Sequence, residues 1–206
     1  MDHVATRRAA KAETIVLACL RCIARDGYAA TSMASIAREA GIDKRLVAYY
    51  HGSREHLLDR VVRHVADQLI TKLRQAIAGI DDPHEIARIG FNRIWESLTT
   101  DRALLVAWLG IKAEAISNPE LQEGARYLND GFRDVIREAW ATIESRGFRA
   151  RMSMERMTLM IVASIQGLVM EWLAYGDTPE LAETLVDVQT WIASFAQPAA
   201  ESPISP

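Results

Sequence analysis

The feature that most constrains this chain is a pair of short helical segments separated by one glycine, in residues 31–50. Gly41 ends the first segment, at a position where the left-handed backbone conformation favours glycine. Ile42, Asp43 and Val47 have the spacing of a hydrophobic staple around an N-cap residue, which sets the angle at which the second helix begins. Because small residues near the turn let the two helices cross closely, the pattern predicts a helix-turn-helix.

The outer face of the predicted second helix carries Lys44, Arg45 and Tyr49. Such residues suit contacts with DNA phosphates and base edges, and a bidentate contact with guanine contributes roughly 1–3 kcal/mol of discrimination. We therefore predict that this unit binds DNA. The alternative is an ordinary solvated basic surface on a helical bundle.

The distribution of charge favours the DNA-binding interpretation, although the net charge of the 206-residue chain is -3. Residues 1–64 contain 11 Lys and Arg against 7 Asp and Glu, whereas the remainder contains 13 against 20. A basic N-terminal third joined to an acidic remainder is typical of a DNA-binding head on a body with another role.

Signals for export, membrane insertion, metal binding and catalysis are weak. The longest uncharged run, residues 157–170, is shorter than the roughly 18 residues of a membrane span, and no signal-peptide pattern is present. Cys19 and Cys22 have the spacing of redox and zinc sites, but without a second pair they better fit packing within a helix. We find no phosphate-binding loop or nucleophile motif. We therefore expect a cytoplasmic protein that is not an enzyme, contacts no membrane, and binds no metal or cofactor.

Helix signals cover almost the whole chain, and no segment alternates convincingly at the period of a β-strand. Capping residues, prolines and glycines predict helices over residues 7–26, two short helices within 31–50, and helices over 54–78, 83–98, 103–111, 119–146, 153–176 and 179–195. The predicted fold is all-α, with nine helices: three in a head, one connector and five in a body. Residues 197–206 contain three prolines and are predicted to be a disordered tail.

Several segments together resemble a known family: Asp26-Gly27-Tyr28, Ala30-Thr31-Ser32-Met33, Ile36–Ile42 and Tyr50–Glu55. On these residues, the chain resembles the TetR family of bacterial transcriptional regulators over roughly residues 7–60. A weaker similarity over residues 100–195 extends to the body of the choline-responsive repressors of this family. It is carried by Trp108-Leu109, Asn118–Leu121 and Gly167-Leu168.

The resemblance implies a homodimer in which residues 1–52 form the DNA-binding domain. Residues 53–196 would form a ligand-binding and dimerisation domain, with the helix over residues 53–80 as connector. The two heads would bind adjacent major grooves of near-palindromic double-stranded DNA, and a small-molecule effector would release this repressor from its operator. The alternatives are a helical ligand-binding protein or enzyme without DNA function, and a regulator that activates or responds to no ligand.

Position by position, the resemblance places Thr31 and Arg54 at phosphate contacts, and Tyr49 and Tyr50 at an aromatic pair near the end of the recognition helix. His51 stands where the family usually has phenylalanine, so we expect a wetter junction between the third and fourth helices. The predicted DNA-binding residues are Thr31, Ser32, Asp43, Lys44, Arg45, Tyr49, Tyr50 and Arg54.

Polar side chains within apolar segments of the body indicate a small-molecule site, because buried polar groups need partners. Trp108 and Glu114 would suit a cationic effector through cation–π attraction. Alternatively, Glu114 forms an ion pair with Arg126 or Arg133. The predicted ligand-binding residues are Trp95, Trp108, Lys112, Glu114, Tyr127, Phe132, Gln166 and Trp172.

The last two predicted helices carry more apolar residues than one monomer core needs. A paired four-helix bundle formed with a second copy would bury them. The alternative is one wide face that packs within the same chain. The predicted dimer residues are Ile161, Ile165, Leu168, Leu185, Val188 and Ile192.

Overall fold

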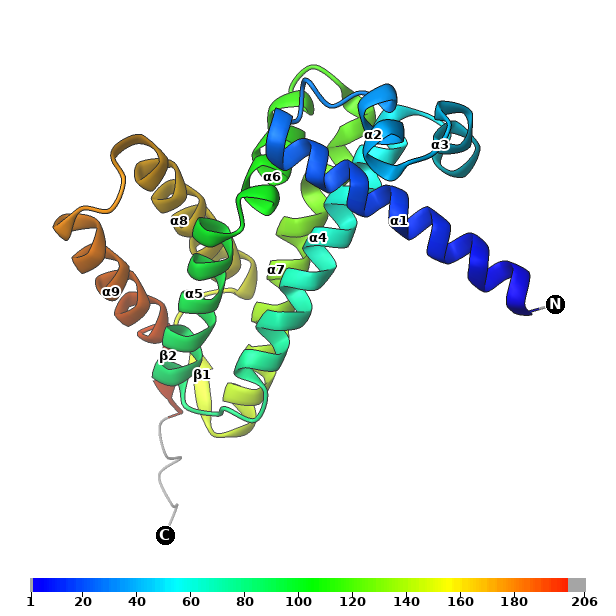
Figure 1. Cartoon of the computed structure of the whole chain (residues 1–206). Helices are drawn as coiled ribbons and strands as arrows, with labels where there is room; N and C mark the ends of the chain where they lie inside the picture. The colour runs from blue at the N-terminus through cyan, green and yellow to red at the C-terminus, as the bar shows by residue number, and fades with distance from the viewer. Residues whose placement is uncertain (1, 200–206) are drawn as a thin grey trace, which may run out of the picture. The chain divides into compact units, whose positions relative to one another are not determined.

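The computed structural model describes residues 2–199, and these are almost entirely helical (Figure 1). The helices within this range are α1 (Asp2–Asp26), α2 (Met33–Ala40), α3 (Lys44–His51), α4 (Arg54–Ile77), α5 (Pro83–Thr100), α6 (Arg102–Glu114), the 3-10 helix η1 (Pro119–Leu121), α7 (Gln122–Ser145), α8 (Met154–Tyr175) and α9 (Pro179–Ala193). The predicted all-α architecture with nine α-helices is therefore confirmed for the part of the chain that the structure describes.

Two short strands depart from the prediction. β1 (Phe148–Ala150) pairs in antiparallel register with β2 (Ala196–Pro198), with Arg149 opposite Gln197. Three residues are too few to show the alternation that identifies a strand in a sequence. Gln197 and Pro198 thus belong to a strand rather than to the predicted tail, and the tail from residue 200 onward lies outside the described residues.

The chain divides into two compact units. The first contains the residues up to Gln68 together with Ser97–Asn129, and the second contains Leu69–Glu96 together with the residues from Asp130 onward. Consequently α4, α5 and α7 each contribute residues to both units.

Within the first unit, α1 packs against α2, α3 and α6. Ile15, Ile23, Ile36 and Val47 are fully buried there and hold the three N-terminal helices together. Burying such aliphatic side chains stabilises a fold by roughly 1.5–3 kcal/mol each. Apolar spacing along the short helices therefore determines which face of each is inside.

The predicted turn between the two short helices, α2 and α3, is present with the expected backbone conformation and caps. Gly41 adopts a left-handed conformation with φ 64°, and the N–H of Ile42 donates to the carbonyl of Ala37 at 3.0 Å. The Asp43 carboxylate then accepts the N–H of Arg45 at 2.7 Å and caps α3. These caps satisfy backbone groups that would otherwise lack partners at the helix ends, so the turn is locally determined.

Both cysteines lie in α1 with no exposed surface. Burial raises the pKa of the Cys19 thiol to about 12, with a smaller contribution from the neighbouring Cys22. Thiols in this state pack as small apolar groups and are poor nucleophiles.

The second unit is a helical body built from the C-terminal part of α4, most of α5 and α7, and all of α8 and α9. Thr178 caps α9 by accepting the N–H of Leu181 at 3.1 Å, and Pro179 occupies the first turn, as the sequence predicts. An ion pair between Arg74 and Glu138 joins α4 to α7 at 2.8 Å.

Candidate nucleic-acid interface and ligand cavity

The solvent face of α3 presents two cations and an aromatic ring. Lys44 and Arg45 are exposed in its first turn, and Tyr49 is 65% exposed one turn further on. The rings of Tyr49 and Tyr50 meet edge to face, with centroids 5.3 Å apart. The guanidinium of Arg8, from α1, lies 5.5 Å from the centroid of the Tyr49 ring and extends this basic surface. An exposed tyrosine among cations can stack on sugars and bases or donate to phosphate.

Three other predicted DNA-binding residues have structural roles in the head. Asp43 caps α3, and Ser32 caps α2 through reciprocal bonds with Ser35 at 2.9 and 3.1 Å. Thr31 is only 1% exposed, and its hydroxyl donates to the carbonyl of Gly27 at 2.8 Å. The Thr31 hydroxyl is therefore not free for the predicted phosphate contact in this conformation.

Arg54 also acts within the head. Its Nε donates to the carbonyl of Thr31 at 2.6 Å, and one Nη donates to the carbonyl of Tyr28 at 2.8 Å. The guanidinium lies 5.7 Å from the centroid of the Tyr28 ring. A planar group with five donors can hold two carbonyls and a ring face together in a way that lysine cannot. Arg54 thus ties the start of α4 to the loop that leads into α2.

His51, at the end of α3, is buried and only 6% exposed. Its Nε2 lies 3.1 Å from the carbonyl oxygen of Ala12, which can only accept, so Nε2 carries the proton. Nδ1 is buried and has no hydrogen-bond partner among the described residues. Burial lowers the pKa of His51, and the hydrogen bond to Ala12 opposes this shift. The imidazole is therefore enclosed by protein at the end of α3, and the expected wetter junction stays a prediction.

This burial predicts a pH-dependent stability. Unfolded His51 takes up a proton below its ordinary pKa of 6.5, whereas the folded form resists protonation. The unfolded state therefore binds more protons in this window, and the free energy of unfolding falls as the pH drops below 6.5 toward the depressed folded pKa. Urea unfolding at several pH values should show a smaller loss for His51→Phe than for the native chain. The exposed His84, replaced by phenylalanine, is the control, and an identical pH dependence in His51→Phe and the native chain would contradict the assignment.

The predicted ligand-binding residues divide between the two units. Four of them belong to the first unit: Trp108, Lys112, Glu114 and Tyr127. The other four belong to the second unit: Trp95, Phe132, Gln166 and Trp172. Helical spacing alone could not separate these groups, because α5 and α7 contribute to both units.

The predicted cation site at Trp108 is occupied by the protein itself. The ammonium of Lys112 lies 4.6 Å from the centroid of the Trp108 ring, and burial lowers the pKa of this lysine. Of the two arginines considered as ion-pair partners of Glu114, Arg126 donates to Gln122 and Arg133 donates to Asp130. The role of Glu114 therefore stays a prediction.

Three of the remaining predicted residues contact partners within their own units. The hydroxyl of Tyr127 donates to Asp67 at 2.7 Å. Trp95 and Trp172 meet edge to face with ring centroids 6.5 Å apart, and Trp172 donates from Nε1 to Asp177 at 3.0 Å. These contacts engage the polar atoms of Tyr127 and Trp172, whereas Nε1 of Trp108 is buried with no hydrogen-bond partner among the described residues.

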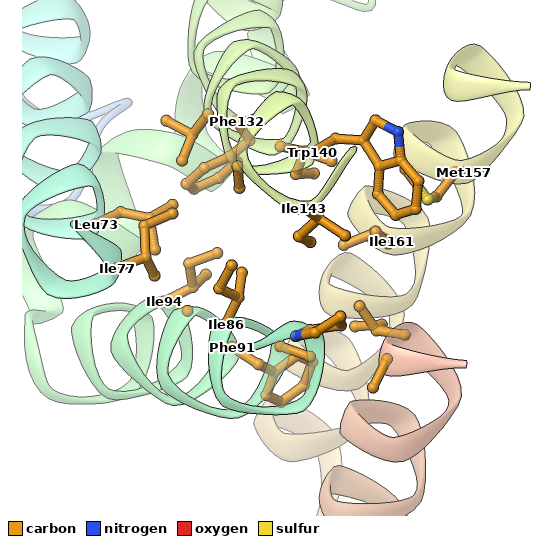
Figure 2. Close-up of a pocket in the computed structure, with 18 of the residues that line it drawn as sticks. Leu73, Ile77, Ile86, Phe91, Ile94, Phe132, Trp140, Ile143, Met157 and Ile161 are labelled. Carbon is orange, nitrogen blue, oxygen red and sulfur yellow. The ribbon is translucent and has the colours of Figure 1, made fainter. Parts of the chain in front are cut away.

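A cavity lies inside the second unit, and Figure 2 shows side chains from α4, α5, α7 and α8 pointing into it. Its volume is about 100 Å³, which is room for a slender apolar group rather than for a bulky drug-sized molecule. Its lining includes Leu73, Phe91, Phe132, Trp140, Met157 and Ile161. Of the predicted ligand-binding residues, Phe132 alone lines it. The sequence analysis did not identify the other residues that line the cavity, because apolar residues at helical spacing look the same whether they fill a core or surround a cavity.

Comparison with known proteins identifies the family. Residues 15–61 match the family model for bacterial regulatory proteins of the tetR family, and residues 93–197 match the model for the C-terminal part of the BetI-type transcriptional repressor. The chain belongs to the TetR family. It is therefore a transcriptional regulator with a BetI-type body, not an enzyme.

Individual TetR-family proteins resemble the chain along most of its length. The HTH-type transcriptional regulator BetI of Brucella canis is 27% identical over 194 residues, which cover 91% of this chain and 93% of that protein. A TetR transcription regulator from Haloarcula marismortui superposes with a TM-score of 0.77 at 20% identity, covering 92% of this chain and all of that one. The regulator FadR of Bacillus subtilis, solved in complex with stearoyl-CoA, has a TM-score of 0.74 at 20% identity and covers 88% of this chain and 97% of that one.

The predicted dimer residues of this TetR-family chain do not share one outer face. Ile161, Ile165 and Ile192 line the cavity, so half of the predicted set faces inward. The others are half-buried: Leu168, Leu185 and Val188. A helix this apolar has no polar stripe to show which side faces inward, and only the packed structure assigns the faces.

A different apolar face of α8 is open to solvent. Leu159 and Met170 are 56% and 45% exposed, and Val186 on α9 is 60% exposed. By length and composition α8 could cross a membrane, since an 18-residue window has a mean hydropathy of 1.6, and only 33% of that window is buried. The apolar surface left on α8 is therefore large for a helix at the surface of a unit.

Proposed function

We propose that this chain is a repressor that binds a near-palindromic operator as a homodimer and leaves it when a small-molecule effector binds. The observation that carries the proposal is the exposed face of Lys44, Arg45 and Tyr49 on a head whose turn is buried and capped. A second observation supports the effector, because the body of the same chain holds a cavity lined by apolar side chains. Since its target is DNA, we place its action in the cytoplasm.

Lys44 and Arg45 are proposed to contact phosphates and base edges in the major groove, with Tyr49 and Tyr50 beside them. Asp43 and Ser32 are proposed to act by capping the helices that carry these contacts. Thr31 and Arg54 would position the start of α2 rather than bind DNA through their own side chains, because both groups are already engaged with backbone carbonyls.

The exposed stripe on α8 is proposed to pair with its equivalent in a second copy. Leu159, Ala163, Gly167 and Met170 follow one another at helical spacing, and all four are exposed. Nothing lies within 4 Å of a Cβ built on Gly167, so the stripe leaves room for close approach of another helix. The exposed Val186 on α9 would extend this interface, with Leu168, Leu185 and Val188 at its edge. One head offers few DNA contacts, so a dimer is also needed for useful affinity.

The effector is proposed to act through α4. Leu73 and Ile77, in its C-terminal half, line the cavity, and Arg54, at its N-terminus, holds the loop before α2. A ligand that favours a displaced α4 would disturb the spacing of the two heads on DNA. Linkage requires the effector to bind the DNA-incompetent state more tightly, and requires DNA to weaken effector binding by the same factor.

The test is a titration of the full chain with the DNA upstream of its own gene, at low and at physiological salt. We expect two protomers per site and a preference over random duplex. Affinity should fall roughly a thousandfold or more between 50 and 200 mM salt, as for a protein with several phosphate contacts. Binding by a monomer, or equal affinity for random duplex, would refute the proposal.

A further inference from the structure

We infer that the effector is an amphiphile with a hydrocarbon body, which fills the cavity of the second unit while its polar end stays in an adjoining groove. The inference rests on the proposed function, in that it names the class of molecule to which this regulator responds. It replaces the small cation that the sequence suggests.

The first argument is the chemistry of the lining. Among the described residues, each of the 21 that line the cavity is apolar, and they come from α4, α5, α7, α8, α9 and the start of β2. Figure 2 shows the labelled aliphatic and aromatic side chains converging on this space. A hydrocarbon leaves water for such a site with a gain in free energy proportional to its buried area.

The same lining disfavours a small cation. Removing a full charge from water is costly unless a counter-ion or several hydrogen bonds replace the solvent. The aromatic rings of Phe91, Phe132 and Trp140 offer cation–π attraction, but the residues that line the cavity include no carboxylate. A cation in this cavity would therefore have to be held by ring faces without a counter-ion.

The second argument is a polar groove that adjoins the cavity. Ile77, Ile86, Val135 and Ala139 line both spaces, so the two are neighbours in the second unit. The groove adds three polar side chains: Arg74, Glu138 and Thr142. The proposed ligand passes between these four shared side chains, with its body in the cavity and its polar end in the groove.

The ion pair in the groove is suited to such an end. Arg74 donates from Nε and one Nη to the two oxygens of Glu138, each at 2.8 Å, and both side chains are about half exposed. A guanidinium has five N–H donors, so this bidentate pairing leaves others for a hydroxyl or a carboxylate. Thr142 adds a hydroxyl that is exposed in the same groove.

Gly90 provides a way to fill the cavity without disturbing the fold. It lines the cavity from within α5, and a Cβ built on it would lie 3.5 Å from Ile77 Cγ2 and 3.7 Å from Leu73 Cδ1, which is ordinary contact. Alanine therefore fits without strain, and a leucine side chain would extend into the space that a ligand occupies. Both residues also favour helix over glycine, so neither variant opposes the formation of α5.

The experiment measures binding of 1-hexanol, 1-octanol, 1-decanol, decanoic acid and choline to the full chain by calorimetry and by thermal shift. Within the alcohols, Kd should fall roughly fourfold for each added methylene until the cavity is full, which corresponds to about 0.8 kcal/mol per methylene. Decanoic acid should bind as decanol does, and choline should produce no shift. Gly90→Leu should weaken decanol binding roughly tenfold or more, while Gly90→Ala binds it as the native chain does.

Binding of choline that Gly90→Leu abolishes would overturn the inference, as would alcohol binding that does not depend on chain length. If Gly90→Leu fails to fold, Ala139→Leu fills the cavity from α7 instead. Operator binding is measured on the same preparations. Retained operator binding without any alkyl binding defeats this inference alone, whereas alkyl binding without operator binding defeats the proposed function and leaves the cavity assignment intact.

Discussion

Replacing Lys44 and Arg45 together with alanine is expected to weaken operator binding roughly a hundredfold or more, because each base contact contributes roughly 1–3 kcal/mol. Both side chains are exposed in the first turn of α3, and alanine is the best helix former, so the head should keep its stability. The Asp43 cap is untouched by the change. Fluorescence anisotropy with operator and random duplexes measures the loss, and urea unfolding checks the fold.

The matched control is Lys72→Ala, which removes an exposed lysine from α4. It should leave operator affinity nearly unchanged, because it removes one positive charge without changing α3. If the Lys44 and Arg45 variant loses affinity equally for operator and random duplex, these residues bind phosphate without reading sequence. A loss no larger than that of the control would remove α3 from the interface altogether.

Replacing Gly110 with alanine is expected to lower the free energy of unfolding by about 1–3 kcal/mol, the usual cost of overpacking a core. Gly110 lies in α6, and a Cβ built on it would overlap the Cβ and ring of Tyr28, which is only 5% exposed. The higher helix propensity of alanine offsets part of this loss. Because the Tyr28 carbonyl is held by Arg54, a displaced Tyr28 should also weaken operator binding.

Gly90→Ala is the matched control for Gly110→Ala. Both glycines lie inside helices, but a Cβ on Gly90 meets only ordinary contacts, so this change should be neutral or stabilising. Urea unfolding measures the free energy of unfolding of both variants. Because both replace a helical glycine with alanine, the difference between them reports the packing effect alone. Equal stability of Gly110→Ala and Gly90→Ala would show that α6 and the Tyr28 segment separate without cost.

The head was predictable because its signals are local. Gly41, Asp43 and Val47 determine the turn and the start of α3 through their own backbone and nearest neighbours. Such interactions depend on spacing along the chain, and the sequence displays that spacing directly. The exposure of Lys44 and Arg45 then follows from the helical period.

Residues whose roles depend on distant partners were harder to predict. The basic side chain of Arg54 suggests a phosphate contact, yet its donors reach the carbonyls of Tyr28 and Thr31 more than twenty positions away. His51 likewise meets Ala12 across 39 positions. A local sequence pattern cannot predict these hydrogen bonds, because they form only when distant segments of the chain pack together.

By itself, then, the sequence of this chain determined the helices, the capped turn of the head and the charged face of α3, since each follows from contacts within a few residues. Only the tertiary structure decided which apolar residues surround a cavity and which face solvent. Ile161 and Leu159 stand two positions apart on α8, and one lines the cavity while the other is exposed. Apolar burial is non-directional, so the side on which a uniformly apolar helix finds its neighbours is settled by packing.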